Sequence, residues 1–534
     1  MIHNLLKRIS SCIVLLTLTL AETEAQSIKS ITPMGPRQVS VTASASGRTV
    51  LQWTFDDRDD AIWNSLGESR MAHKKRVRFL APNHSGLVPR FRVLDRQAVI
   101  PGDSLFNPSN IRVLRMQISE ADMKRMLANL PDFSGVDNGG GEVGPGGEIT
   151  GGNENPLTEP DPGIPVIDPG DPGDFPDGPT VLEPEYAYVP AIASFEGGRK
   201  ARIGIRIKGN ASLLFAVMDK RKNYPFKLDL NYFKSGQNID GIQKLNLHPV
   251  VSTQPQTVIP GDPPVSFPGS YGLEEYLSYG AFRAFGVPAS RTGWMDVYLN
   301  GEYLGLYTCL ENTDSKFMER NFGKFRGATY KPEGEYLDWK GSDYGKYQFL
   351  NWKGGGDGKH TSILRFLDII NHQPVTSYPD VVDVQSVFNY TAGNVALGNW
   401  DTYEALGHNF LLYEGQAGRF QMLPWDMNLS QAAHPGNSLY GKTEAPTLEG
   451  EQGMPAPALT DKIYDTPEND ARYRATLRAF IEGPASENAL NARIDDAVAL
   501  LGARLNKDAI EILRSNIKTR LEIIEEMLDK TGAQ

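Results

Sequence analysis

The chain has 534 residues, of which 40% are hydrophobic and 9% aromatic, and its formal net charge at pH 7 is −11. This apolar content is typical of a folded globular protein and excludes a wholly disordered one. The length allows two or more domains, or one large domain with elaborations. The acidic balance argues against a nucleic-acid partner, because binding phosphates needs a basic face.

The N-terminal segment has the make-up of a secretory signal. Lys7-Arg8 gives a positive start, Ile9 to Leu20 an apolar core, and Thr23-Glu24-Ala25 a small-residue cleavage site. We expect residues 1–25 to be a signal peptide, and the protein to be secreted, periplasmic or held at the cell surface or coat. An uncleaved N-terminal anchor is the alternative. Apart from this segment, we expect no transmembrane segment, because no other run approaches that length.

Cysteine usage fits an exported chain that folds without an internal disulfide. Cleavage after Ala25 would remove Cys12 and leave Cys309 as the single thiol. One thiol cannot form an internal bridge, so burial of a core must hold the protein together. We interpret Cys309, which lies in a predicted strand, as a small buried hydrophobe.

Residues 26–103 are predicted to form a small β-rich N-terminal extension. The alternating runs Val39 to Ala43 and Arg48 to Phe55 indicate strands. The acidic run Asp56 to Asp60 is compatible with a cation site, but Arg58 interrupts it and a solvated turn is the preferred interpretation. No chemistry is assigned to this extension.

The main domain is predicted to span residues 104–530. It opens with a strand over Ile111 to Ile118 and a helix capped by Ser119, with Asp122 in the acidic position of a capping box. Residues 134–185 are rich in Gly, Pro, Asp and Glu and contain no Lys or Arg, which predicts a disordered acidic insertion. A calcium-binding repeat is the alternative interpretation of its Asp-Pro-Gly units.

Order is expected to return after the insertion, and Asn300-Gly301 is the pair typical of a type I′ turn. A glycine-rich loop is expected over residues 351–360, where a phosphate cradle is conceivable although no strand–loop–helix context supports it. The remaining patterns predict strands at 200–207, 223–231 and 244–248, helices at 273–285 and 383–400, a hairpin at 294–311, and packing helices from residue 470.

The most informative stretch runs from Asn399 to Ser430. It contains Asp401 and Asp426, each directly after a Trp, and between them His408-Asn409 and two apolar runs separated by a turn. This pattern predicts a two-stranded hairpin with a carboxylate near each outer end. Because a hairpin brings its outer ends together, Asp401, Asn409 and Asp426 are expected to converge on one cation. Oxygen ligands of this kind suit Mg²⁺ better than zinc.

This stretch resembles the CotH kinase family, atypical protein kinases first known from bacterial spore coats. The shared blocks are Asp401 with His408-Asn409, and Pro424-Trp425-Asp426. Upstream, Val297 to Tyr307 with Glu311 is similar to the family's "NGxxxGxY…E" strand pair, and residues 328–334 to its "YKPEG" strand. The resemblance covers residues 111–528. It implies an α+β fold, an elaborated atypical protein-kinase-like domain with a helical C-terminal part.

The resemblance also implies roles. Asp401 would be the catalytic acid that accepts or orients the substrate hydroxyl, and Asp426 and Asn409 would hold Mg²⁺ (or Mn²⁺). Lys227 would reach the phosphates of ATP, with Glu311 as its ion-pair partner. Lys208, Lys220 and Lys222 compete with Lys227 for that role, and Lys208 follows a strand at a turn where relatives commonly carry Arg. Each carboxylate also has a purely structural interpretation, as a cap or a bond to a backbone N–H.

The resulting hypothesis is an exported, Mg²⁺-dependent kinase that transfers the γ-phosphoryl group of ATP to Ser or Thr of a coat or surface protein. One alternative is a catalytically silent relative that serves in coat or surface assembly. Another is a surface carbohydrate-binding protein. Nucleotide turnover, nucleotide binding without turnover, and glycan binding without nucleotide binding would separate the three.

Overall fold

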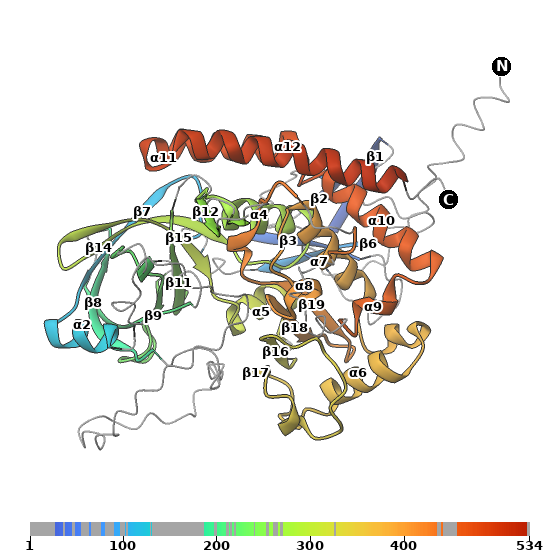
Figure 1. The fold of residues 1–534 in the computed structure, drawn as a ribbon, viewed down its shortest axis with the longest axis horizontal. Helices are drawn as coiled ribbons and strands as arrows, with labels where there is room; N and C mark the ends of the chain where they lie inside the picture. The colour runs from blue at the N-terminus through green and yellow to red at the C-terminus, as the bar shows by residue number, and fades with distance from the viewer. Residues whose placement is uncertain are drawn as a thin grey trace.

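In the computed structural model, the side chains of residues 105–128, 186–196, 200–209, 221–239, 241–251, 271–324, 327–434, 439–441 and 457–530 are described, with a few single residues between them. Strands β1 to β6, β12 (Gln256–Ile259) and β13 (Val265–Phe267) are described as backbone. The predicted signal peptide (1–25) and acidic insertion (134–185) lie outside the described residues. Figure 1 shows the arrangement of the elements.

The N-terminal region contains the predicted strands. The patterns at 39–43 and 48–55 correspond to β2 (Gln38–Ser44) and β3 (Arg48–Thr54). Two three-stranded sheets are present, in the orders β1-β2-β5 and β4-β3-β6. The remaining strands here are β1 (Ser27–Gly35), β4 (Asn64–Ser65), β5 (Arg76–Leu80) and β6 (Arg90–Arg96). The domain boundary at residue 103 stays a prediction.

Seven strands close into a barrel in the order β10-β11-β15-β14-β7-β8-β9. All neighbours are antiparallel except β14 and β7, which run parallel. Closure leaves no free sheet edge, and the alternating apolar residues of each strand fill the interior. The strands are β7 (Ile111–Gln117), β8 (Val189–Phe195), β9 (Ala201–Ile207), β10 (Phe226–Asp229), β11 (Lys244–Pro249), β14 (Thr292–Leu299) and β15 (Glu302–Glu311).

Three local predictions in and beside the barrel are confirmed. Ser119 caps α2 (Glu120–Leu127) by accepting a hydrogen bond from the N–H of Asp122. Asn300 and Gly301 connect β14 to β15 with φ of 52° and 89°, as a type I′ turn requires. Cys309 is fully buried in the barrel core, where burial raises the pKa of its thiol.

A second part combines a four-stranded sheet, in the order β17-β16-β18-β19, with helices. Its strands are β16 (Thr329–Pro332), β17 (Leu350–Gly354), β18 (Phe410–Glu414) and β19 (Phe420–Pro424). The predicted loop at 351–360 is wrong in its first half, because residues 350–354 form β17. The glycines that follow have a packing reason: a Cβ on Gly355 would lie 2.1 Å from the carbonyl oxygen of Gly327.

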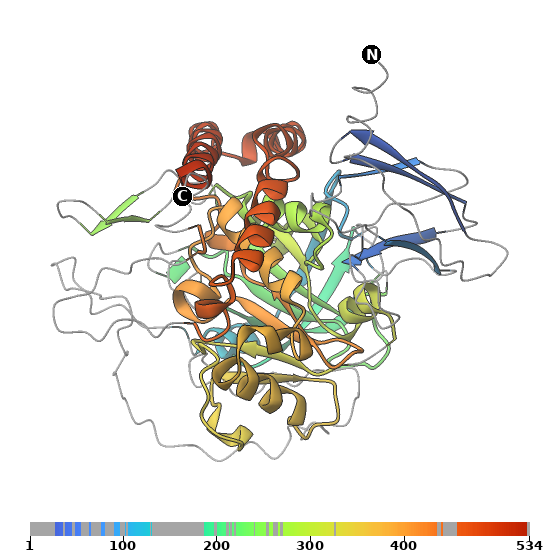
Figure 2. The ribbon, with the colours of Figure 1, turned by 90° about the vertical axis from the view of Figure 1, so that its right-hand side faces the viewer.

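Helices cover this sheet and connect it to the barrel. Helix α4 (Glu274–Phe285) precedes β14 and confirms the helix predicted at 273–285, and Gly286 ends it in the left-handed conformation. Helices α11 (Glu487–Leu501) and α12 (Lys507–Lys530) lie side by side along one face (Figures 1 and 2). The other helices of this part are α5 (Ser315–Phe322), α6 (Thr361–His372), α7 (Val384–Ala396), α8 (Tyr403–Leu406), α9 (Thr460–Ile463) and α10 (Pro467–Ile481).

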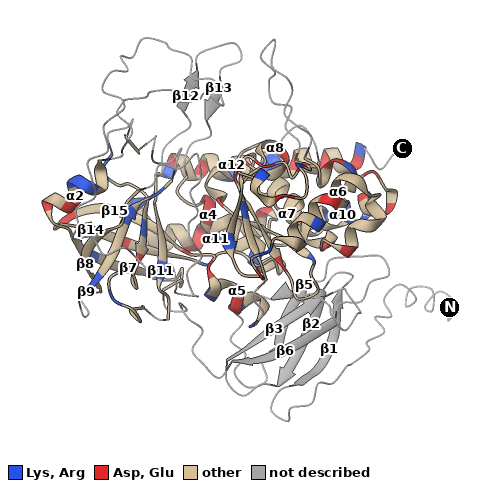
Figure 3. Ribbon diagram, turned by 90° about the horizontal axis from the view of Figure 1, so that it is seen from below, with Lys and Arg blue, Asp and Glu red and all other residues tan. Residues whose placement is uncertain are grey.

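The fold is therefore mixed α+β with a helical C-terminal part, as predicted, whereas the closed seven-stranded barrel was not predicted. Acidic and basic side chains are interspersed over both parts (Figure 3). Among the described helices, none is both long enough and apolar enough to span a bilayer.

Helix α7 packs so closely on α4 that a glycine is needed at the contact. A Cβ on Gly393 would lie 2.2 Å from a ring carbon of Phe282. We predict that Gly393→Ala lowers the free energy of unfolding by about 1–3 kcal/mol through overpacking, although Ala favours helices. Urea unfolding measures this. Adding Phe282→Leu should restore part of the loss, and an increase in stability for Gly393→Ala alone would contradict the close approach.

Candidate active site

The register of the β18–β19 hairpin brings the two sequence blocks to one end. Phe410 pairs with Pro424, and the N–H of Trp425 donates to the carbonyl of Asn409 at 3.2 Å. Asn409 and Asp426 both have positive φ, 61° and 50°. Asn and Asp tolerate this conformation better than most residues, and it lets the chain turn away from each strand at the point where the polar side chains lie.

Asp401, which precedes α8, is held at the same end of the hairpin. The Asn409 side-chain N–H donates to the Asp401 carbonyl at 3.1 Å, and His408 Nε2 is hydrogen-bonded to Asp401 Oδ1. Burial by itself would lower the pKa of His408, but the bond to Asp401 and the negative fields of Glu333 and Asp426 raise it. The structure therefore places Asp401, Asn409 and Asp426 at the same end of the hairpin, with the Asp401 carboxylate bonded to His408. Their convergence on one cation stays a prediction.

Asp426 opens onto a cavity between the barrel and the second part. The barrel contributes Lys208, His248 and Glu311, α4 contributes Glu275, and Asp426 follows the end of β19. The cavity is also lined by Asn246, Tyr279, Ser290, Leu310 and Trp425. Residues from at least five separate parts of the sequence thus meet at one polar site.

The Asp426 carboxylate is in an unusual electrostatic state. Its residue is partly exposed, but its Oδ1 atom is buried and has no hydrogen-bond donor. Burial raises the pKa of Asp426, Glu275 adds to the effect, and the positive groups Lys208, His248 and Lys331 oppose it. A buried carboxylate oxygen without a donor is costly, and a bound cation would remove that cost.

Across the cavity, three polar side chains form a chain of contacts. Lys208 Nζ lies 2.8 Å from His248 Nε2, and His248 Nδ1 lies 2.8 Å from Glu275 Oε2. Glu275 is only 7% exposed, and its Oε1 also has no hydrogen-bond partner. Two buried acceptor oxygens without donors, on Glu275 and Asp426, therefore line the same cavity beside a Lys ammonium.

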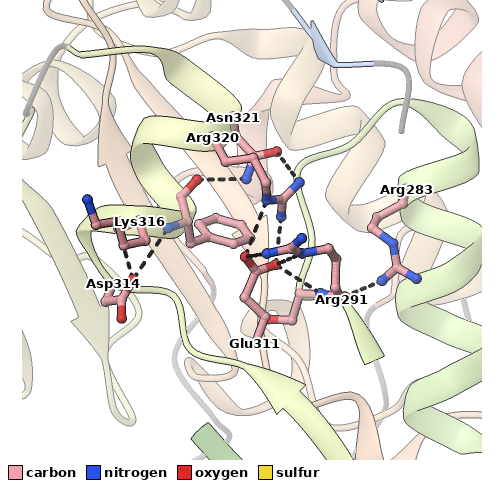
Figure 4. A network of polar contacts seen from close by, with 9 residues as sticks. Arg283, Arg291, Glu311, Asp314, Lys316, Arg320 and Asn321 are labelled. Carbon is pink, nitrogen blue, oxygen red and sulfur yellow. Dashed lines mark hydrogen bonds and ion pairs between the residues drawn. The ribbon is translucent and has the colours of Figure 1, made fainter. Parts of the chain in front are cut away.

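Glu311 is engaged by two arginines (Figure 4). Arg291 Nη2 and Arg320 Nη2 donate to its two carboxylate oxygens at 2.6 and 2.7 Å, and all three side chains are buried. Burial alone would raise the pKa of Glu311, but Arg291 and Arg320 lower it to about 2. This cluster joins the end of β15 to α5 and to the segment before β14, so Glu311 forms part of the cavity wall.

Of the lysines predicted to contact the phosphates, Lys208 and Lys227 lie in different places. Lys208 lines the cavity. Lys227 lies on β10, where it is opposite Arg206 and Asn246 in register and is 9% exposed. The predicted Lys227–Glu311 ion pair stays a prediction, and the partners shown for Glu311 are the two arginines.

Sequence reasoning missed His248 and Glu275. Both were assigned to correct elements, a strand at 244–248 and a helix at 273–285. Nothing in the local pattern marked them as polar groups that face Asp426, because that contact depends on how α4 packs between the barrel and the second sheet. The sequence shows only that Glu274 and Glu275 stand at the start of a helix. Acidic residues are common there because they interact favourably with the helix dipole, so they do not by themselves indicate a site.

A scan against protein-family models gives a match over residues 267–529, to the family described as CotH kinase protein. This part of the chain belongs to the CotH kinase family. The match starts at residue 267, later than the resemblance, which was stated from Ile111. The site residues inside the match are Glu275, Glu311, Asp401, Asn409 and Asp426, and Lys208 and Lys227 lie before it. No curated protein matches the chain.

Asp426 and Glu275 are the residues of this cavity that could hold a magnesium ion. Within the described residues, no three His, Cys, Asp or Glu side chains gather into a metal-binding group. Mg²⁺ commonly uses one or two carboxylates and takes its other ligands from water and substrate phosphates. The unpartnered oxygens of Asp426 and Glu275 meet that requirement.

The Glu311 cluster generates a stability prediction. We expect Glu311→Gln to lower the free energy of unfolding by about 3–5 kcal/mol at neutral pH, since it leaves two buried guanidinium groups without their carboxylate. The control Glu302→Gln, at the other end of β15 in an exposed pair with Lys222, should cost less than about 1 kcal/mol. Chemical denaturation of both variants checks this.

The same cluster sets a pH dependence. The folded pKa of Glu311 is about 2, below the ordinary value of 4.5. Its contribution to stability is therefore complete above about pH 4.5 and is lost as the pH falls toward 2. The wild type should lose stability more steeply than Glu311→Gln in that window. Parallel curves for the two proteins would contradict the assigned ion pairs.

Proposed function

We propose that the protein is a Mg²⁺-dependent kinase that transfers the γ-phosphoryl group of ATP to a Ser or Thr hydroxyl of a coat or surface protein. Membership of the CotH kinase family supports the reaction class. The observation that carries the assignment to this cavity is the buried, unpartnered Oδ1 of Asp426 facing a Lys ammonium. Phosphoryl transfer needs this combination of a cation ligand and a positive group for the phosphates.

In this proposal, Asp426 and Glu275 hold the cation with their unpartnered oxygens. Asn409 adds its amide oxygen, since its N–H is already used on the Asp401 carbonyl. The cation supplies charge neutralisation on the β- and γ-phosphates. Lys208 contributes a further positive charge, and its contact with His248 holds the ammonium at the cavity.

Asp401 orients the substrate hydroxyl. His408 occupies its Oδ1, which fixes the carboxylate and leaves Oδ2 to accept the hydroxyl proton. The hydroxyl oxygen forms a bond to the γ-phosphorus while the bond from that phosphorus to the β–γ bridging oxygen breaks, ADP leaves, and Asp401 takes the proton. Catalysis of this kind depends mainly on positioning.

We also propose that the protein acts outside the cytoplasm, on the strength of the signal-like residues 1–25. The substrate would then be a protein in the same compartment. ATP is scarce there, so this proposal requires a nucleotide supply, for instance in a compartment that is filled before it is sealed.

The test is phosphoryl transfer by the purified full chain with labelled ATP and Mg²⁺ or Mn²⁺. We expect autophosphorylation or transfer to a Ser/Thr-rich protein, lowered at least about 100-fold in Asp426→Asn and in Asp401→Asn. Asp368→Asn, which changes an exposed acid on α6, is the matched control and should keep wild-type activity.

Two results would overturn the proposal. One is nucleotide binding without any turnover by the wild type, which would indicate a silent member of the family. The other is equal activity in the wild type and Asp426→Asn, which would place the reaction elsewhere.

A further inference from the structure

The C-terminal helix α12 carries a fully buried arginine with an unusual set of partners. Arg520 Nε donates to the Ala396 carbonyl at 2.8 Å, Nη1 to the Ala432 carbonyl at 2.7 Å, and Nη2 to Gln431 Oε1 at 3.1 Å. The side chain is 0% exposed. All three acceptors are neutral oxygens, and none of them belongs to a carboxylate.

This arrangement is energetically expensive. Burial lowers the pKa of Arg520 to about 9, so the group is still charged at neutral pH. A buried charge that is not paired with an opposite charge destabilises the fold even when it is hydrogen-bonded. An apolar side chain would continue the face formed by Ile517, Leu521 and Ile524 on the same helix. We therefore ask which segments the three hydrogen bonds of the guanidinium hold in place.

The acceptors lie at the end of α7, which leads into the Asp401 loop, and on the loop that follows Asp426. Ala396 is the last residue of α7, whose chain continues into Asp401, and Ala432 lies shortly after Asp426. The last carbonyls of a helix lack partners within it and carry partial negative charge, so a cation is favoured there. Arg520 thus caps α7 and, with the same guanidinium, holds the loop that follows Asp426.

The two loops also bond directly to each other. The N–H of Gln431 donates to the Leu397 carbonyl at 2.7 Å, and that of Ala432 to the Gly398 carbonyl at 3.2 Å. A Cβ on Gly398 would lie 2.5 Å from the Ala432 carbonyl oxygen and 2.9 Å from Cδ of Arg520. The loops therefore cross at close quarters, with Arg520 against the crossing.

The connection extends to α4. Gln431, itself fully buried, donates from Nε2 to Ser278 Oγ at 2.9 Å, and Ser278 Oγ lies 2.7 Å from Ser430 Oγ. Helix α4 carries Glu275 one turn earlier. One guanidinium, through Gln431, is therefore linked to all three elements that supply acidic groups to the candidate site.

We propose that Arg520 is a positioning residue, which fixes the loops of Asp401 and Asp426 and, through Gln431, helix α4 in one relative geometry. This inference rests on the proposed function for its effect on catalysis. Its structural part, a clamp on residues 396–401 and 430–432, is independent of any activity. The C-terminal helix then acts on the reaction without touching a substrate.

The test compares Arg520→Met with Ile524→Ala in the full chain. Both change buried side chains on α12, and Ile524→Ala should destabilise the fold because it leaves a cavity. The Ile524 side chain has no polar group that could bond either loop, so this variant controls for the loss of stability alone. Hydrogen–deuterium exchange of the loop amides, together with kcat and the KM for ATP, is measured for both variants.

We expect Arg520→Met to speed exchange at residues 397–401 and 430–432 and to lower kcat about 100-fold, with little change in KM, since displacements near 1 Å can cost that much. Ile524→Ala should leave loop exchange and kcat close to wild type. Equal effects of the two variants, or unchanged loop exchange in Arg520→Met, would overturn the inference. If the wild type itself transfers no phosphoryl group, the proposed function fails, and the exchange data alone decide whether the clamp exists.

Discussion

A carboxylate taken out of water needs a donor or a cation, and this requirement organises the site around Asp426. Its Oδ1 is buried without a hydrogen-bond donor, and Glu275 presents a second such oxygen to the same cavity. Lys208 and His248 lower the cost of two neighbouring negative groups but do not remove it. The arrangement is explained if the site is completed by a divalent cation and an anionic substrate, which are the components of phosphoryl transfer.

The architecture serves this requirement by bringing three parts of the chain to one point. The closed barrel fixes Lys208 and His248, the β18–β19 hairpin fixes Asn409 and Asp426, and α4 lies between the two parts with Glu275. The Arg291–Glu311–Arg320 cluster stiffens the barrel wall of the cavity, and Arg520 holds the loops on its other side. Costly buried charges are thus concentrated around the candidate site, as expected where geometry must be kept against stability.

What the sequence predicted follows from local rules. The cap at Ser119, the Asn300-Gly301 turn and the β18–β19 hairpin each depend on residues close together in the chain, and each is confirmed. The hairpin alone was enough to place Asn409 beside Asp426. The contacts of His248 and Glu275 were not predictable, because they arise from the packing of α4 against the barrel. The arginines that bind Glu311 were missed for the same reason, since side-chain pairing in a buried cluster leaves no periodic signal. Residues 351–354 were predicted to be loop, because the glycine run that begins at Gly354 masked a short strand.

The most direct test of the account is to locate Mn²⁺ by anomalous X-ray scattering in crystals grown with a non-hydrolysable ATP analogue. The account predicts an ion within about 2.3 Å of Asp426 Oδ1, a distance typical of oxygen ligands, with a Glu275 oxygen nearby and the phosphates facing Lys208. An analogue bound at another surface, or a cavity with neither ion nor phosphate, would contradict it.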